Sequence, residues 1–167
     1  MKRFFSVFLL IILLGAPLGW AQTFSVSILE DSRGDDSPAL SEAVLDGCLD
    51  YLFASGLIAT NESVGRVEES VFRSRGYGMA SAREGFVDFA AFVWIRYVSL
   101  AGVPDVTVPE IVRWRIVRVR DESVLEEGTT PPPQYEEMTA DERKKVYMDF
   151  GRSLADLWAK ALWKDRG

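Results

Sequence analysis

The distribution of apolar and polar positions predicts strands and helices that alternate along the chain. Residues 23–30 alternate in polarity, which predicts a strand with one face toward a core. Residues 38–55 then repeat apolar positions at helical spacing. This helix has Ser37 as its N-cap and Pro38 at its first position, and Gly56 is placed to end it.

The middle of the chain contains the most apolar segment. A short strand is predicted over 57–60 and a short helix over 79–84, while residues 61–78 fit either a helix or a loop. Val87–Val98 is apolar at successive positions, so both faces of this strand are predicted to be covered. We therefore place it at the centre of a sheet.

The last part of the chain predicts a hairpin followed by a long helix. Strands are expected over 108–120 and 124–128. The Pro-rich residues 129–136 form an extended connector, because proline can join neither a helix interior nor a sheet interior. A capping box then opens an amphipathic C-terminal helix over 139–164. Together these elements predict a single α/β (α+β) domain over 22–167, with one mixed sheet of about four or five strands and helices packed on it.

The first twenty-one residues have the pattern of a signal peptide helix. A positive start precedes the apolar run Phe4–Leu14, and small residues before Gln22 predict cleavage between Ala21 and Gln22. The alternative is an uncleaved membrane anchor. Gln22 stands where a lipoprotein would have its cysteine, so we expect a periplasmic or secreted protein that is not a lipoprotein, without a membrane span after signal removal.

Composition excludes several classes of function. The formal net charge is −6, which disfavours nucleic acid as a partner. The chain has no histidine, so histidine-dependent nucleophiles and histidine metal sites are excluded; no metal and no cofactor is expected. Its one cysteine, Cys48, lies on an apolar helical stripe and is expected to be a buried, inert thiol.

Four arginines form the densest basic cluster: Arg113, Arg115, Arg118 and Arg120. Strict alternation puts the first two on one face of the strand and the last two on the other. A bulge near Ile116 and Val117 would bring all four to one side, where they could bind an anionic partner. The alternative is a solvated face whose arginines pair with Glu126, Glu127 and Asp88 across the sheet.

Two tryptophans on the last predicted helix differ in their expected exposure. Trp158 follows the apolar stripe and is expected in the core. Trp163, near the helix end, is expected to be exposed and is a candidate partner-binding residue.

The order of elements resembles the amino-terminal α/β domain of TolB and the related envelope assembly factors LpoB and CsgG. Three patterns carry the resemblance: strand Phe24–Leu29 leading into helix 38–55, Ala82–Phe89 with a helix that ends at Gly85 and runs into a strand, and the meander that begins at Val112–Val117. The chain is too short for TolB's propeller and lacks a lipid-attachment cysteine. The resemblance implies a non-enzymatic module that binds another envelope protein.

We therefore expect an exported, periplasmic, non-catalytic binding or assembly domain of the bacterial envelope. One alternative is a small exported hydrolase that uses a carboxylate pair, either Glu126 with Glu127 or Asp35 with Asp36. Another is a structural protein that self-associates through its last helix.

Overall fold

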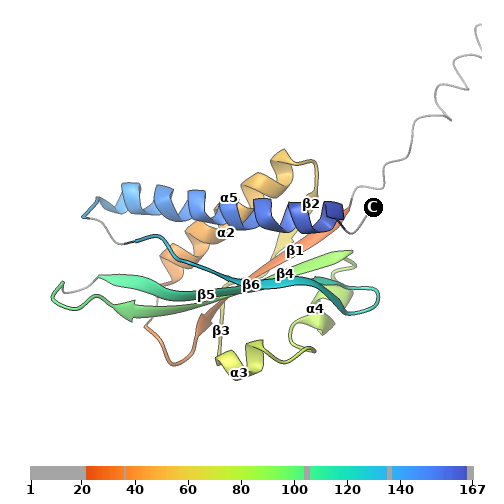
Figure 1. The fold of residues 1–167 in the computed structure, drawn as a ribbon, viewed down its shortest axis with the longest axis horizontal. Coiled ribbons are helices and arrows are strands. Elements are labelled where there is room, and N and C mark those ends of the chain that lie inside the picture. The colour runs from red at the N-terminus through yellow and green to blue at the C-terminus, as the bar shows by residue number, and fades with distance from the viewer. Residues whose placement is uncertain (1–21, 36, 104–105, 135–136, 165–167) are drawn as a thin grey trace, which may run out of the picture.

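The computed structural model describes residues 22–35, 37–103, 106–134 and 137–164. The predicted signal peptide 1–21, with Ala21 of its cleavage site, lies outside the described residues, as does Asp36. Ten elements follow one another within these described residues (Figure 1): β1 Thr23–Asp31, α2 Pro38–Ala54, β2 Ile58–Asn61, β3 Gly65–Val67, α3 Glu69–Phe72, α4 Met79–Glu84, β4 Phe89–Ser99, β5 Thr107–Arg118, β6 Ser123–Thr130 and α5 Ala140–Lys164.

The strands form one mixed sheet in the order β2-β1-β4-β5-β6. β1 runs parallel to β2, β3 and β4, whereas β4, β5 and β6 form an antiparallel meander. The short β3 pairs with the end of β1, beyond the residues that pair with β2. The predicted fold class is confirmed.

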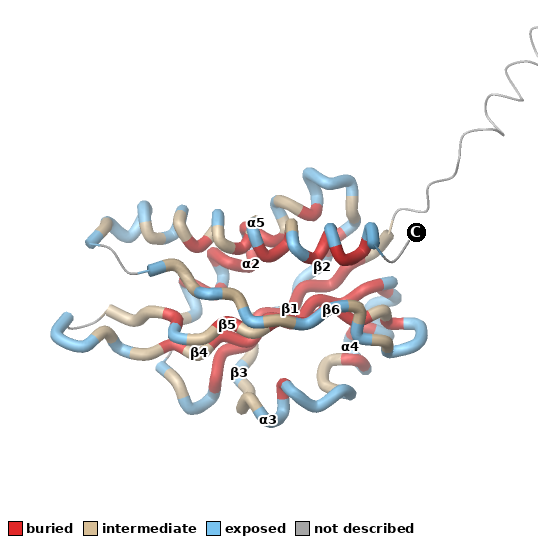
Figure 2. Tube along the Cα trace, in the orientation of Figure 1, coloured by how far each residue is buried: buried red, intermediate tan, exposed pale blue. Residues whose placement is uncertain are grey.

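The helices cover the sheet from both sides, so two cores result. α2 and α5 pack on one face and α3 and α4 lie on the other (Figure 1). Phe24, Val93 and Trp158 belong to the core under α2 and α5, and Phe92 and Trp94 to the core on the α3 and α4 side. Figure 2 shows the buried residues concentrated in the sheet and on the inward faces of α2 and α5. The central position predicted for β4 is confirmed, since it lies between β1 and β5.

The two long helices cross at a pair of glycines. A Cβ atom on Gly47 of α2 would lie 1.9 Å from the Met148 carbonyl oxygen, and one on Gly151 of α5 would lie 2.1 Å from the Val44 carbonyl oxygen. Only hydrogen fits at either position, so these glycines set how closely the backbones approach.

Several element boundaries differ from the sequence prediction: β4 begins at Phe89 rather than Val87, and β5 ends at Arg118 rather than at residue 120. β6 continues through Thr130, so the extended connector begins at Pro131 rather than at residue 129. Residues 61–78, for which the sequence left helix and loop open, contain both β3 and the four-residue α3. A hydrogen bond from β4 positions the start of α3: the Trp94 indole Nε1 donates to the carbonyl oxygen of Val67, just before the helix, at 3.1 Å.

The helix-start predictions met different outcomes. The capping box is present at α5, where Thr139 N donates to Glu142 Oε2 at 2.8 Å and Glu142 N donates to Thr139 Oγ1 at 3.3 Å. At α2, Ser37 is the N-cap residue but makes no side-chain cap hydrogen bond. Its backbone N instead donates to Glu30 Oε2 at 3.4 Å.

Candidate functional site

The four arginines do not share one face. The β4–β5 register is unbroken from Trp94↔Arg113 to Phe89↔Arg118, so β5 alternates strictly over this stretch. The bulge that the sequence suggested near Ile116 occurs in β6, which carries Leu125 as the extra residue, and therefore does not turn β5.

The arginines consequently fall into separate environments. Arg113 and Arg115 lie on the α3/α4 side of the sheet, together with Val117. Arg118 lies on the other side, where it pairs with Asp121 at 3.2 Å, and Arg120 is exposed in the turn after β5. The expectation that a bulge unites all four is wrong.

Arg115 is a buried cation. Only 4% of the residue is exposed, and its guanidinium lies 5.2 Å from the ring centroids of both Phe72 and Phe92. It donates to the carbonyl oxygens of Ser74 at 2.8 Å and Tyr77 at 3.2 Å. Two aromatic faces and two carbonyl dipoles thus replace part of the lost hydration.

The protonated state of Arg115 is costly to bury. Burial lowers the pKa of Arg115 from its ordinary value, and the Glu127 carboxylate opposes this. Among the described residues, no carboxylate lies within ion-pairing distance of Arg115, and its buried Nε has no hydrogen-bond partner there. A buried guanidinium with unused donor capacity favours binding of an anionic or hydrogen-bond-accepting group.

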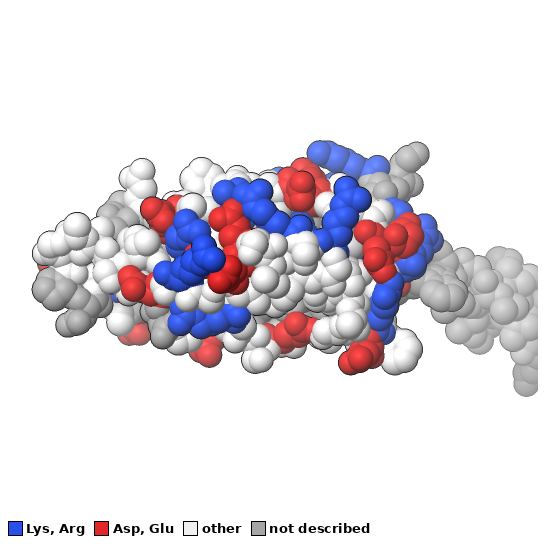
Figure 3. All heavy atoms as spheres, turned by 90° about the horizontal axis from the view of Figure 1, so that it is seen from below, with Lys and Arg blue, Asp and Glu red and all other residues white. Residues whose placement is uncertain are grey.

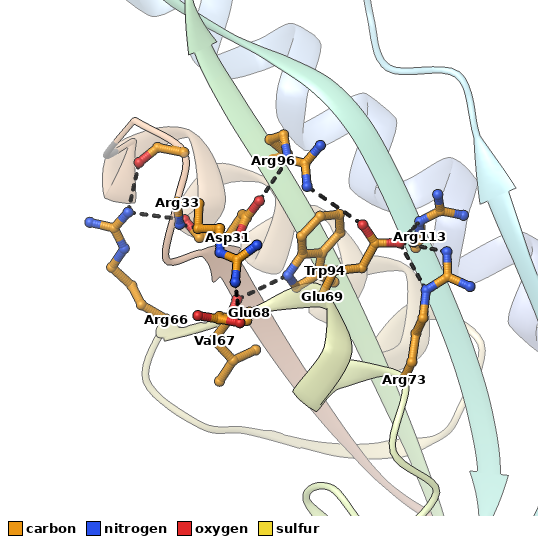
Figure 4. Close-up of polar contacts among 11 residues, drawn as sticks. Asp31, Arg33, Arg66, Val67, Glu68, Glu69, Arg73, Trp94, Arg96 and Arg113 are labelled. Atoms are coloured by element: carbon orange, nitrogen blue, oxygen red, sulfur yellow. Dashed lines mark hydrogen bonds and ion pairs between the residues drawn. The ribbon is translucent and has the colours of Figure 1, made fainter.

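Glu69, at the start of α3, forms ion pairs with three arginines (Figure 4). Its Oε1 lies 2.8 Å from Arg73 Nε and 2.9 Å from Arg113 Nε, and its Oε2 lies 3.5 Å from Arg96 Nη2. The Arg73 hydrogen bonds, followed by the charges of Arg113, Arg73 and Arg96, lower the pKa of Glu69. The surrounding charge is therefore more positive than a one-to-one pairing would give.

The same network continues to the end of β1. Arg96 Nε donates to Asp31 Oδ2 at 2.6 Å, and the Asp31 side chain is 1% exposed. Arg66 donates to the Asp31 and Gly34 carbonyl oxygens at 3.0 and 2.8 Å (Figure 4). This network joins β1, β4, β5 and α3, so it fixes the positions of Arg73 and Arg113.

An open cavity of about 370 Å³ lies against these side chains. It is lined by Phe72, Arg73, Arg113, Trp114, Arg115, Glu127, Gly128 and Thr129. Seen from the side of α3 and α4, basic and acidic groups lie next to one another on this face rather than in one basic patch (Figure 3). The lining can hold a carboxylate between arginines and an apolar group against aromatic rings.

A second cavity, of about 490 Å³, lies between β6 and the end of α5. Its lining residues are Glu126, Leu157, Lys160, Trp163 and Lys164. Trp163 is 57% exposed and Trp158 is fully buried, as expected for both.

The carboxylate pairs of the hydrolase alternative gain no support. Glu126 and Glu127 line different cavities, so they do not converge on one substrate. Asp35 is described, but its partner Asp36 is not. Glu30 is buried in a different setting, where it accepts from Ser41 Oγ at 2.7 Å.

Arg113 pairs with Glu69, and both Arg118 and Arg120 pair with Asp121. Arg115 lies opposite Glu127 in the β5–β6 register, and the charge of this carboxylate acts on it, as the cross-strand alternative expects. The sequence reasoning missed Glu69 and Arg96; the i,i+4 spacing of Glu69 and Arg73 was the one local signal for an ion pair there.

Within the described residues, no group of three or more Asp, Glu or Cys side chains is arranged to hold a metal ion. No helix in that part of the chain combines the length and apolar character needed to cross a membrane.

No family model matches the sequence, and a search of curated proteins finds no match. Solved structures with a similar fold include a variant PelC dodecamer from Paraburkholderia phytofirmans, with 16% identity over 80% of this chain and 86% of that one and a TM-score of 0.48. TolB from Acinetobacter baumannii matches with 11% identity over 84% of this chain and 28% of TolB, at a TM-score of 0.45. The LpoB C-terminal domain from Salmonella enterica matches with 9% identity over 71% of this chain and 87% of that one, at 0.40. The expected resemblance to TolB and LpoB is confirmed at the level of the fold, and the likeness to CsgG stays a prediction.

Proposed function

We propose that this chain is an exported, periplasmic, non-catalytic binding domain of the bacterial envelope, and that the Arg113–Arg115 cavity receives an acidic segment of another envelope protein. The signal-like leader supports the compartment. The histidine-free composition and the separated Glu126 and Glu127 support a binding role rather than catalysis.

The observation that carries the proposal is Arg115. A charge buried without a carboxylate costs stability, and a chain that needed only packing at this place could use an apolar residue instead. Arg113 lines the same cavity with 30% of its side chain exposed, so an incoming carboxylate can reach it from solvent. Phe72 and Trp114 supply apolar surface beside the charge.

Site-specific photo-crosslinking in living cells tests the binding role. A photoreactive residue in place of Thr129, exposed at the rim of the cavity, should capture one envelope protein in stoichiometric amount. The same group in place of Ser153, exposed on α5, should not. Absence of any specific product from the Thr129 position would contradict the proposal.

A pair of matched arginine variants tests the site. Arg113→Gln should abolish the crosslink, because it removes a cation from the cavity. Arg152→Gln should leave it intact: Arg152 is also ion-paired, to Asp50 at 2.8 Å, but lies on α5. Equal crosslinking in both variants would exclude the arginine cavity as the binding site.

Export is tested separately. Amino-terminal sequencing of the protein purified from cells should give a chain that begins at Gln22. Recovery of the full-length chain from the cytoplasm would exclude a periplasmic role, whatever the cavity binds.

A further inference from the structure

The outer edge of β6 is a free strand edge that borders the arginine cavity. β6 is the last strand in the order of the sheet, and among the described residues it pairs with β5 alone. The extra residue Leu125 interrupts its pairing on one side and Pro131 follows it on the other, so its regular stretch is 126–130. An edge of this kind can accept one further extended segment through backbone hydrogen bonds.

The hydrogen-bond pattern of the sheet determines which backbone groups of β6 point outward. Val119 N, just after β5, donates to the Asp88 carbonyl oxygen at 2.9 Å, so the odd-numbered residues of β5 direct their backbone groups toward β4. The even-numbered residues of β5 direct theirs toward β6, where the even-numbered residues pair with them. The backbone N–H and C=O groups of Glu127 and Thr129 therefore point away from the sheet.

The same two residues line the arginine cavity. Glu127 lies opposite Arg115 and Thr129 opposite Arg113, so their side chains share the α3/α4 side of the sheet. Arg113 Nη1 donates to Thr129 Oγ1 at 3.2 Å, which shows that this guanidinium reaches across to the edge strand. A residue that exchanged backbone hydrogen bonds with Thr129 would have its Cα about 5.5 Å away and its side chain on this same side. That side chain would lie beside Arg113.

The charges around the cavity leave room for one carboxylate. Its lining contains three cations and one anion, namely Arg73, Arg113, Arg115 and Glu127. Glu69 adds a second carboxylate, which Arg73 and Arg113 share. One positive charge is left over, and the buried Arg115 Nε has no hydrogen-bond partner among the described residues. A single acidic side chain, rather than a run of them, therefore completes the balance.

We propose that the partner segment binds as an extended strand along β6 and places one carboxylate side chain opposite Thr129, beside Arg113. The proposal rests on the proposed function and adds the conformation and the charge pattern of the segment: one acidic residue between uncharged ones. A second copy of this chain fits this edge less well. β6 contains Glu126 and Glu127 and no cation, so pairing two copies through β6 would bring four carboxylates together.

Nuclear magnetic resonance titration with a synthetic peptide tests the proposal on the chain from Gln22 onward. The probe is the capped hexapeptide Thr-Val-Glu-Val-Thr-Val, which should shift the amide signals of Glu127 and Thr129 and slow their hydrogen exchange. Replacing the glutamate of the peptide by glutamine should weaken binding by about tenfold or more. Methylation of the backbone nitrogen of that glutamate should weaken it as much, without any change to the protein. Absence of these shifts at millimolar peptide would overturn the proposal.

A matched pair of protein variants tests the strand edge itself. Thr129→Pro removes an outward N–H while leaving the bonds to β5, since proline is tolerated where the N–H of an edge strand faces solvent. It should weaken binding of the glutamate peptide by about tenfold or more. Thr129→Ala keeps the N–H and should bind as the wild-type chain does. Equal binding by the two variants, with circular dichroism showing both folded, would overturn the proposal.

The outcomes distinguish this proposal from the proposed function. Binding that requires the peptide glutamate and Arg113, but is unchanged by backbone methylation and by Thr129→Pro, would overturn the added strand and leave the acidic-segment site in place. Peptide binding as expected, with no photo-crosslinked envelope protein in cells, would contradict the proposed function alone. A wild-type dimer in sedimentation equilibrium that Thr129→Pro converts to a monomer would assign the edge to a second copy and overturn the proposal.

Discussion

The Cys48 thiol of α2 donates to the Gly151 carbonyl oxygen of α5, with Sγ 3.3 Å from the oxygen. This contact exists because Gly47 and Gly151 bring the two helix backbones together. The crossing is also tied at its surface, where Tyr51 Oη donates to Asp156 Oδ1 at 2.6 Å. The close approach of α2 and α5 at these glycines therefore determines both how the two helices pack and where the Cys48 thiol is buried.

Gly151→Ala should lower the free energy of unfolding by about 1–3 kcal/mol, because its methyl group would meet the Val44 carbonyl oxygen and push the helices apart. Urea titration followed by circular dichroism measures the change. Gly76→Ala is the matched control: a Cβ at Gly76 meets nothing within 4 Å, so its stability should be unchanged. Equal stability of the two variants would contradict the helix crossing described here.

Cys48 should not react with thiol reagents in the folded protein at mildly alkaline pH. Burial raises the pKa of the Cys48 thiol well above its usual range, so the reactive thiolate is scarce, and the side chain is fully buried. Dithionitrobenzoate should give no colour until concentrated urea is added, after which one thiol per chain should titrate. Rapid reaction in buffer would show that α2 and α5 separate readily.

Glu69→Gln should lower the free energy of unfolding at neutral pH. It should also make this free energy depend less on pH between neutral and acidic conditions. The pKa of Glu69 is lowered from 4.5 in the folded state, so its contribution is present above 4.5 and is lost as the pH falls through the lowered value. Urea unfolding of both proteins across this range measures the difference. A difference that persisted unchanged in strong acid would contradict charge as its source.

Phe86→Gly should raise the free energy of unfolding by about 1 kcal/mol, since Phe86 has φ 52° and glycine adopts this left-handed conformation without strain. Phe86→Ala is the control, because alanine keeps a Cβ and therefore the strain. Thermal unfolding of the three proteins gives the comparison. A loss of stability in Phe86→Gly would mean that the ring packs on its own chain.

Strong local patterns were readable in the sequence. The apolar stripe and capping box located α5 to within a residue, and the doubly apolar Val87–Val98 identified the central strand. Contacts between distant segments were not readable. Glu69 lies in a four-residue helix with no periodicity, and its pairing with Arg113 and Arg96 depends on the sheet register. Arg115 reads as a surface residue, because its burial is created by Phe72 and Phe92 from separate elements.

Two separate short strands, β2 and β3, cover the same edge of β1, and this arrangement protects the sheet against edge-to-edge aggregation. β2 covers Thr23–Val26 and β3 covers Leu29–Asp31, so the outer margin on this side consists of two short pieces with an interruption between them. A foreign strand would find no continuous ladder of backbone donors and acceptors to extend there. Fibril growth from that margin is thereby disfavoured, even though β1 itself is buried along nearly its whole length.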